Sequence, residues 1–282
     1  MNAPRSPEAA RAFFLDAAPG KRFCIYYRPA DSTTHRGNFI YVHPFGEEMN
    51  RSRRMAALQA RAFASLGFGV LQIDLFGCGD SSGEFAQARW EIWKQDLLLA
   101  QDWLNANAAA PVGLWGLRLG ALLALDFAAT ARAPIDRIIL WQPVTSGEQF
   151  MTQVLRLGVA SDMFAGASTE KSGTGAMRAT LASGAIVEVG GYEIAPALAA
   201  AIDAQDTAAL VLPTTRIDWF EAVSQGRAIP PARARVAADW TQRGIDVHMH
   251  AAACAAFWMT PEIVECPALV SATCGVLAEG KT

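Results

Sequence analysis

Gly116, Arg118 and Gly120 form the segment whose residue types and spacing point most directly to chemistry. The segment lies between an apolar run predicted as a strand, Val112–Trp115, and one predicted as a helix, Leu119–Ala131. A sharp strand–turn–helix of this kind admits only small residues two positions before and two after its central residue, which in many enzymes is the nucleophile. Here the central residue is an arginine, whose guanidinium stays protonated and cannot attack a carbonyl carbon.

The other members of a nucleophilic triad are also incomplete. A hydroxyl nucleophile needs a base within hydrogen-bond reach and an acid that orients this base. The base would be a histidine after the last predicted strand, Asp246–Ala251, but the stretch Ala252–Trp258 contains no histidine. Glu221, in the predicted strand Arg216–Val223, occupies the acid position. Two of the three groups are absent, so the sequence predicts that triad chemistry has been lost as a unit.

Several other reactive side chains have simpler interpretations. His248 and His250 point to the same side of a strand, but no third ligand accompanies them, so we predict structural or surface roles and no metal site. His43 follows a predicted strand and either lines a cavity or, as the favoured interpretation, stabilises a turn. Cys78 and Ser146 lack a neighbouring base, and we expect both to be inert.

Arg118 itself requires an anion. A cation at a helix N-terminus is disfavoured by about 0.3–1 kcal/mol, because the amide dipoles there attract negative charge. One hypothesis is an internal ion pair, with three candidate acids: Glu47, Glu48 and Glu221. The second is that Arg118 and the amides of Leu119 and Phe45 form a receptor for a carboxylate, phosphate or sulfate. The two can coexist if a ligand displaces the acid.

The predicted elements alternate between strands and helices. Further predicted strands are Phe23–Tyr27, Asn38–His43, Val70–Leu75 and Ile135–Trp141, and further helices are 55–66, 90–104, 196–204 and 231–243. Near-continuously apolar strands between helices indicate a mostly parallel sheet with helices on both faces. The alternation breaks at about 145–213, which we interpret as a cap-like insertion in a single domain of residues 1–282. We expect a helix to begin at Thr260–Glu262 and the last helix at Pro267.

Two further segments resemble motifs of a known protein family. Asn38–Gly46 resembles the strand and loop that supply an oxyanion amide, and Asp74–Gly83 is similar to a D-x-x-G-x-G-x-S loop. Together with the Gly-x-Arg-x-Gly segment they resemble the α/β-hydrolase superfamily. More narrowly, the chain resembles the second hydrolase type associated with the exosortase A export system, over stretches listed here: His43–Met55, Leu114–Ala124, Gly190–Glu193 and Phe257–Ile263. The resemblance implies an α/β-hydrolase fold and an exopolysaccharide-export setting.

Composition narrows the classes of protein. With 282 residues, 52% of them hydrophobic, the chain can bury a large core. Its net charge of −3 does not indicate the positively charged surface that binds nucleic acid. No apolar run approaches the roughly 18 residues of a membrane span. Met1–Ala10 has no apolar signal region, and five scattered cysteines suggest free thiols, so we predict a cytoplasmic protein. Gly77–Gly83 is a poor match to a dinucleotide fingerprint, and we expect no cofactor.

Three function classes remain open at this point. The first is a noncatalytic hydrolase-fold protein that binds an anionic ligand or a partner. The second is an atypical ester or acyl hydrolase, or an acyltransferase, with relocated catalytic residues. The third is a structural partner protein that needs no cavity. The sequence gives neither a substrate nor an oligomeric state.

Overall fold

An eight-stranded sheet forms the centre of the molecule. The structure, a computed structural model, describes residues 10–164, 173–211 and 215–278. The strand order is β1-β2-β4-β3-β5-β6-β9-β10. The bounds are β1 (Arg11–Asp16), β2 (Lys21–Tyr27), β3 (Gly37–Val42), β4 (Phe68–Ile73), β5 (Val112–Leu117), β6 (Arg137–Trp141), β9 (Arg216–Val223) and β10 (Val247–Ala253). Among the strands described in this sheet, only the β1–β2 and β2–β4 pairs are antiparallel, which confirms the predicted, mostly parallel sheet.

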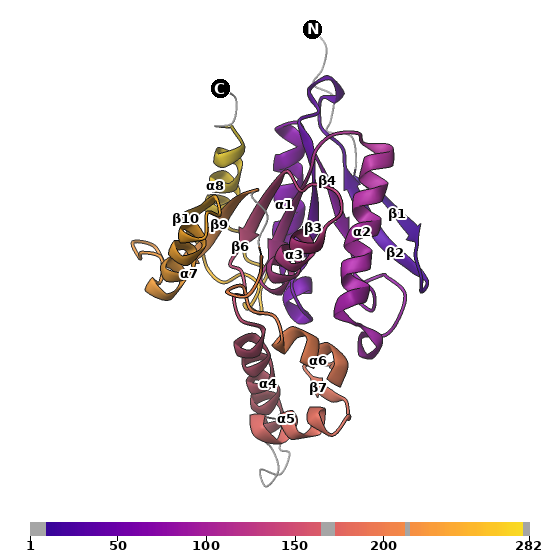
Figure 1. The fold of residues 1–282 in the computed structure, drawn as a ribbon, viewed down its shortest axis with the longest axis vertical. Helices are drawn as coiled ribbons and strands as arrows, with labels where there is room; N and C mark the ends of the chain where they lie inside the picture. Colours follow the sequence, from indigo (N-terminus) through magenta and orange to yellow (C-terminus); the bar gives the residue numbers. More distant parts are fainter. Residues whose placement is uncertain (1–9, 165–172, 212–214, 279–282) are drawn as a thin grey trace.

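Helices cover both faces of this sheet (Figure 1). Their bounds are α1 (Glu47–Ser65), α2 (Trp90–Asn107), α3 (Leu119–Thr130), α7 (Pro231–Gln242) and α8 (Pro267–Ala278). Alternate strand residues face opposite layers: Ile40 packs with α2 and α3, whereas Phe39 and Tyr41 pack with α1. The helix α3 follows Arg118 and is buried almost all round, so the start of this helix is held firmly in the core.

The part of the sequence between β6 and β9, which includes the segment interpreted above as an insertion, forms a smaller lobe (Figure 1). It contains α4 (Gly147–Phe164), α5 (Thr174–Ala182), the hairpin β7 (Val187–Val189) and β8 (Tyr192–Ile194), and α6 (Pro196–Asp203). The helix α4 leaves the edge of the sheet where the parallel strands end and runs outward through this lobe. The sequence predicted α6 but not α4, α5 or the hairpin.

One strand was missed in the sequence, and one expectation about secondary structure was wrong. The edge strand β1 was missed, because it pairs only with β2 and its side chains are mostly exposed, which weakens the apolar signal. Thr260–Glu262 does not begin a helix. The Thr260 hydroxyl donates to the carbonyl groups of Phe257 and Glu262, at 3.2 and 2.9 Å, and so closes a turn instead of capping a helix.

The expectation of free thiols was also wrong for one pair of cysteines. Cys254 and Cys266 form a disulfide, with their Cα atoms 5.6 Å apart, which links the loop after β10 to the start of α8. Cys24, Cys78 and Cys274 are free. The first nine residues, on which the signal-peptide argument rested in part, lie outside the described residues.

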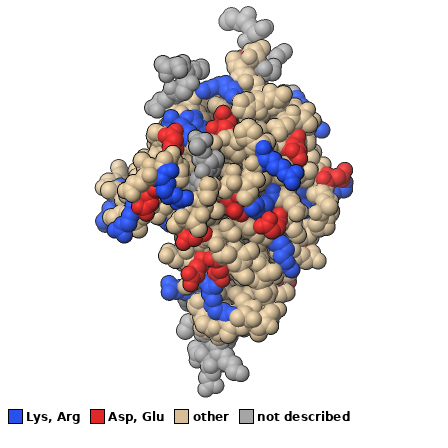
Figure 2. All heavy atoms as spheres, in the orientation of Figure 1, with Lys and Arg blue, Asp and Glu red and all other residues tan. Residues whose placement is uncertain are grey.

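Charged side chains of both signs are mixed on the face shown in Figure 2. Within the described residues, no helix is long and apolar enough to cross a membrane. The described part of the chain also contains no group of three or more histidine, cysteine, aspartate or glutamate side chains that could hold a metal ion.

Candidate ligand-binding site

Arg118 occupies the sharp turn between β5 and α3. Its φ of 55° and ψ of −118° are unusual for a residue with a side chain, and such a conformation costs on the order of 1–3 kcal/mol. The surrounding sheet imposes it. The Arg118 amide donates to the Trp141 carbonyl at 3.0 Å, and the Arg118 carbonyl accepts from the Val144 amide at 3.2 Å. The nucleophile elbow is therefore present in shape, with a guanidinium at its tip.

The two flanking glycines are required by close backbone contacts. A Cβ atom on Gly116 would lie 2.5 Å from the Cα of Ala121. A Cβ on Gly120 would lie 2.3 Å from the Val42 carbonyl oxygen and 2.4 Å from that of His43. None of these atoms belongs to a flexible side chain. Glycine is therefore required at both positions, because α3 lies so close to β5 and to the end of β3.

Gly120→Ala is expected to lower the free energy of unfolding by about 2 kcal/mol, because the new methyl group forces backbone atoms apart. Gly175→Ala is the matched control: this glycine lies in α5 with nothing within 4 Å of the added Cβ, and alanine should be neutral or stabilising there. Denaturant unfolding measures both. Equal stabilities for the two variants would contradict the tight elbow.

Glu48 is the acid that pairs with Arg118. The Arg118 Nε lies 3.3 Å from the Glu48 Oε1. Glu47 instead lies 3.6 Å from the Arg51 Nε and accepts from the Tyr192 hydroxyl at 3.3 Å. Glu221 is fully buried and accepts from the Trp219 indole and the Gln142 amide. Of the three candidate acids, the structure selects the one in the first turn of α1.

Two aromatic rings complete the surroundings of the guanidinium. The Arg118 Cζ lies 5.6 Å from the centre of the Trp258 ring and 5.9 Å from that of Phe150, within the range of cation–π attraction. Trp258 comes from the loop after β10, the stretch where a catalytic histidine was sought. Sequence reasoning noted the missing histidine but did not identify the tryptophan as a contact of Arg118.

The Arg118–Glu48 pair leaves hydrogen-bonding groups unused. Neither Nη group of Arg118 has a hydrogen-bond partner among the described residues, and neither is sealed from solvent. The Glu48 Oε2 is buried and also lacks a partner there. Burial raises the pKa of the Glu48 carboxyl above its usual value, although Arg118 and Arg51 act in the opposite direction. The pair is an incompletely satisfied ion pair at the base of a cavity.

That cavity has a volume of about 750 Å³ and lies between the elbow and the lobe. Its charged lining consists of Glu47, Glu48, Arg51, Arg118 and Arg156. Its apolar lining includes Phe45, Phe150, Val154, Leu157, Val189 and Trp258. The volume falls within the range of about 300–1,000 Å³ that small-molecule sites occupy.

Two of the predicted ligand-binding residues lie outside this cavity. His43 and Leu119 border a separate void of only about 10 Å³ beneath the elbow. The His43 Nδ1 lies 2.8 Å from the Pro44 carbonyl oxygen, and its Nε2 accepts from the Leu75 amide at 3.2 Å. Burial lowers the pKa of this histidine, which keeps it neutral. Both ring nitrogens of His43 thus contact backbone groups close to the end of β3.

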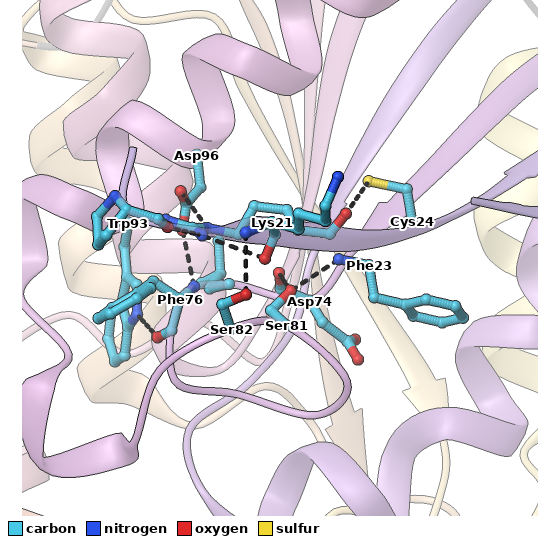
Figure 3. Close-up of polar contacts among 12 residues, drawn as sticks. Lys21, Phe23, Cys24, Asp74, Phe76, Ser81, Ser82, Trp93 and Asp96 are labelled. Atoms are coloured by element: carbon cyan, nitrogen blue, oxygen red, sulfur yellow. Dashed lines mark hydrogen bonds and ion pairs between the residues drawn. The ribbon is translucent and has the colours of Figure 1, made fainter. Parts of the chain in front are cut away.

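A network of hydrogen bonds and one ion pair, with residues of β2 and α2, holds the loop from Asp74 to Gly83 in place (Figure 3). The Arg22 Nε lies 2.6 Å from the Asp96 Oδ1, and the other Asp96 oxygen accepts from the Phe76 amide at 2.8 Å. The Ser81 hydroxyl donates to the Asp74 carbonyl and accepts from the Phe23 amide. Burial also raises the pKa of the Cys78 thiol in this loop, as expected of an inert cysteine.

The remaining candidates have structural contacts. His250 pairs with the buried Asp218 at 3.0 Å, and His248 pairs with Asp246 at 2.8 Å on the surface. The Ser146 hydroxyl accepts from the Gln149 amide at 3.4 Å, at the start of α4. None of these residues is among those that line the cavity.

Comparison with known proteins places this arrangement in a family. The human protein ABHD12B is 30% identical over 133 residues, which are 46% of this chain and 35% of that protein, so the chain spans about a third of this relative. Est1E from Butyrivibrio proteoclasticus, solved with ferulic acid bound, superposes with a TM-score of 0.70 at 15% identity, covering 95% of this chain and 98% of the other.

A second solved structure, mouse α/β-hydrolase domain-containing protein 10, superposes with a TM-score of 0.60 at 16% identity, covering 96% and 99% of the two chains. At these identities the likeness establishes the α/β-hydrolase fold alone. The family model described as serine aminopeptidase, S33, matches residues 33–215, well over half of the sequence. The chain is thus a member of this α/β-hydrolase family.

Proposed function

We propose that this protein is a noncatalytic member of the α/β-hydrolase family that binds an anionic ligand at Arg118. The observation that carries the proposal is the guanidinium at the tip of the elbow, with both Nη groups unpaired among the described residues and a cavity in front of it. The planar fork of an arginine matches two oxygens of a carboxylate, phosphate or sulfate.

The surroundings of Arg118 favour binding over hydrolysis. Hydrolysis through an acyl-enzyme needs a nucleophile and a base in contact with each other. Trp258 lies beside Arg118 where a base would be needed, and both ring nitrogens of His43 are engaged by the backbone. The wide cavity also argues against a purely structural partner protein, for which a closed cleft was expected.

The Arg118–Glu48 pair resembles a placeholder. An arriving anion would take the free Nη groups, and Glu48 would give up part of its hold on the guanidinium. This combines the two hypotheses for Arg118, an internal ion pair and an anion receptor. It also accounts for a cation at the start of α3, where negative charge is favoured.

The cellular setting is a separate part of the proposal. The resemblance to the second exosortase A-associated hydrolase type suggests a role in exopolysaccharide export. A cytoplasmic location remains part of this hypothesis, and the Cys254–Cys266 disulfide weighs against the free-thiol argument on which the location rested.

Sulfate, phosphate or acetate is expected to raise the melting temperature of the native protein. At ten times its Kd, such an anion stabilises the folded state by about 1.4 kcal/mol, or roughly 3–5 °C for a chain of this size. Arg118→Ser should abolish this shift, and it should bring no esterase activity because no base reaches the new hydroxyl. Thermal scans at constant ionic strength and a chromogenic ester assay measure the two effects.

Arg156→Ser is the matched control, since Arg156 also lines the cavity but lies on the exposed side of α4. It should keep the anion-dependent shift. A fluorophosphonate probe tests the competing activity directly. Covalent labelling of any serine in the native protein would instead support an atypical hydrolase, and native protein that no anion stabilises would contradict the binding proposal.

A further inference from the structure

The cavity at Arg118 is much larger than an inorganic anion requires. It measures about 750 Å³, whereas a water molecule takes up about 30 Å³ in the liquid and a sulfate only a few times more. Arg118 and Glu48 account for one end of this space. The remainder must suit some other part of a ligand.

An apolar stripe on α4 leads away from the guanidinium. Phe150, Val154 and Leu157 line the cavity at positions i, i+4 and i+7, which share one face of a helix. Phe150 contacts the Arg118 guanidinium, and the rise of an α-helix places Leu157 about 10 Å farther along. In Figure 1, α4 runs outward from the edge of the sheet, so the stripe leads from the elbow toward the outside of the lobe.

Residues from two other segments border the same space. Val189 of β7 and Tyr192 of β8 line it from the hairpin, and Met259 lines it from the loop after β10. The hairpin packs directly on α4, since a Cβ on Gly158 would lie 3.0 Å from a Val189 methyl group. Three separate parts of the chain thus surround a mainly apolar channel.

Charge at the base of the channel suits a single negative charge. Arg51 is already engaged, because its Nη1 donates to the Met259 carbonyl at 2.6 Å and its Nε lies 3.6 Å from Glu47. Arg118 is left as the cation with free donors at this end, and Glu48 beside it opposes a second negative charge. Arg156 belongs to the exposed rim of the cavity, two turns from Phe150.

We infer that the ligand is a single-chain amphiphile, with a carboxylate on Arg118 and an alkyl or acyl chain lying along the stripe of α4. The inference rests on the proposed function and specifies its ligand class. A stripe of about 10 Å accommodates a chain of roughly eight carbons, at about 1.2 Å per extended bond. A carboxylate fits because its two oxygens meet one guanidinium fork with one unit of charge.

A series of straight-chain acids tests this inference. Affinities of acetate, butanoate, hexanoate and octanoate for the full-length protein are measured by calorimetry, with 1-octanol as a neutral chain of equal length. Affinity should rise roughly threefold per methylene from butanoate to octanoate, somewhat below the value for complete burial. Octanol should bind at least tenfold more weakly than octanoate, and Arg118→Ser should remove that difference.

The Leu157→Asp variant tests the contribution of the ligand's alkyl chain separately from that of its carboxylate. Leu157 is 59% exposed, so the change should leave folding intact while weakening octanoate at least tenfold and acetate little. Ile186→Asp is the matched control, because Ile186 is 48% exposed in the same lobe and does not line the cavity. It should leave both affinities unchanged.

The outcomes distinguish the inference from the proposed function. If octanoate binds no more tightly than acetate, while acetate still requires Arg118, the amphiphile is wrong and the anion site stands. If octanol binds as tightly as octanoate, or Arg118→Ser leaves octanoate binding intact, the head group is not anchored and both ideas fail. Both also fail if no acid in the series binds.

Discussion

Asp218→Asn is expected to lower the free energy of unfolding by about 3 kcal/mol at pH 7, since it removes a fully buried carboxylate that pairs with three neighbouring side chains. Asp218 is fully buried in β9. Its carboxylate lies 3.0 Å from the Arg216 Nη2, 3.0 Å from the His250 Nε2 and 3.4 Å from the Arg137 Nε. These partners come from β6, β9 and β10, so one side chain joins the strands that lead into the loops around Arg118.

The effect should depend on pH in a definite direction. Burial opposes ionisation of Asp218, but its hydrogen bonds to His250 and Arg216 and the charge of Arg137 outweigh it and hold the pKa below the ordinary value. A carboxyl whose folded-state pKa is lowered contributes stability above its unfolded pKa of about 3.9 and loses it as pH falls through the folded value. The difference between native protein and variant should persist from pH 7 to 5 and narrow below about pH 4.

Asp246→Asn provides the matched control on the same sheet edge. Asp246 also pairs with a histidine, His248, but the two side chains are 57% and 44% exposed. An exposed pair contributes about 0–1 kcal/mol, so this variant should unfold almost like the native protein. Urea titrations at pH 7 and pH 3 measure both. An Asp218→Asn variant as stable as Asp246→Asn would show that the buried cluster contributes no net stability.

The sequence predicted the parts of this molecule that depend on local constraints. Gly116 and Gly120 identify the elbow because only a missing side chain allows α3 to approach the ends of β5 and β3 so closely. The central strands were recognised because burial on both faces makes them continuously apolar. The absence of a histidine after β10 could also be read directly from the chain.

The contacts of the site depend on packing that no local pattern encodes. Glu48 was one of three candidate acids, and which one reaches Arg118 depends on how the first turn of α1 packs against the start of α3. Trp258 reaches the guanidinium only because β10 lies in the same sheet as β5, some 130 residues earlier. Cys254 and Cys266 are twelve positions apart in no recognised motif, so their disulfide was missed.

The lining of the cavity was missed for a different reason. The helix α4 lies in a segment rich in glycine, alanine, serine and threonine, where the strand–helix alternation fails. Its stripe of Phe150, Val154 and Leu157 has helical spacing, but Phe150 alone of the three is buried, and the partly exposed apolar residues Val154 and Leu157 give a weak signal. The sequence therefore singled out Arg118 as a candidate, but it did not predict the cavity that Arg118 lines.

Binding of an anion at Arg118 is expected to take up protons, at most one per ligand, at pH values between the pKa of Glu48 in the free protein and its higher pKa in the complex. The Glu48 carboxyl is already poised for protonation, because burial raises its pKa and its Oε2 has no partner among the described residues. A bound anion adds negative charge beside it and takes a share of Arg118. Both changes raise the pKa of Glu48 further, since two anions then compete for one cation.

The sign of the linkage follows from this order of pKa values. Because the pKa of Glu48 is higher in the complex than in the free protein, affinity is greatest below the free-protein value and falls as pH rises between the two. In that interval the affinity should fall by up to tenfold per pH unit, and above it the affinity becomes constant. Arg51 of α1 also lowers the pKa of Glu48, and the charge of Glu48 in turn raises the pKa of the buried Tyr41 of β3.

Calorimetry with octanesulfonate measures this uptake, because the sulfonate head does not titrate in the range studied. The binding enthalpy in buffers of different ionisation enthalpy gives the number of protons bound. Glu48→Gln should abolish the uptake, flatten the pH profile and bind the anion more tightly at neutral pH, because the competing charge is gone. Glu47→Gln is the control, since Glu47 pairs with Arg51 and is half exposed, and it should retain the uptake. Native protein that binds octanesulfonate with no buffer dependence would show that Glu48 keeps its charge and that the anion does not compete with it for Arg118.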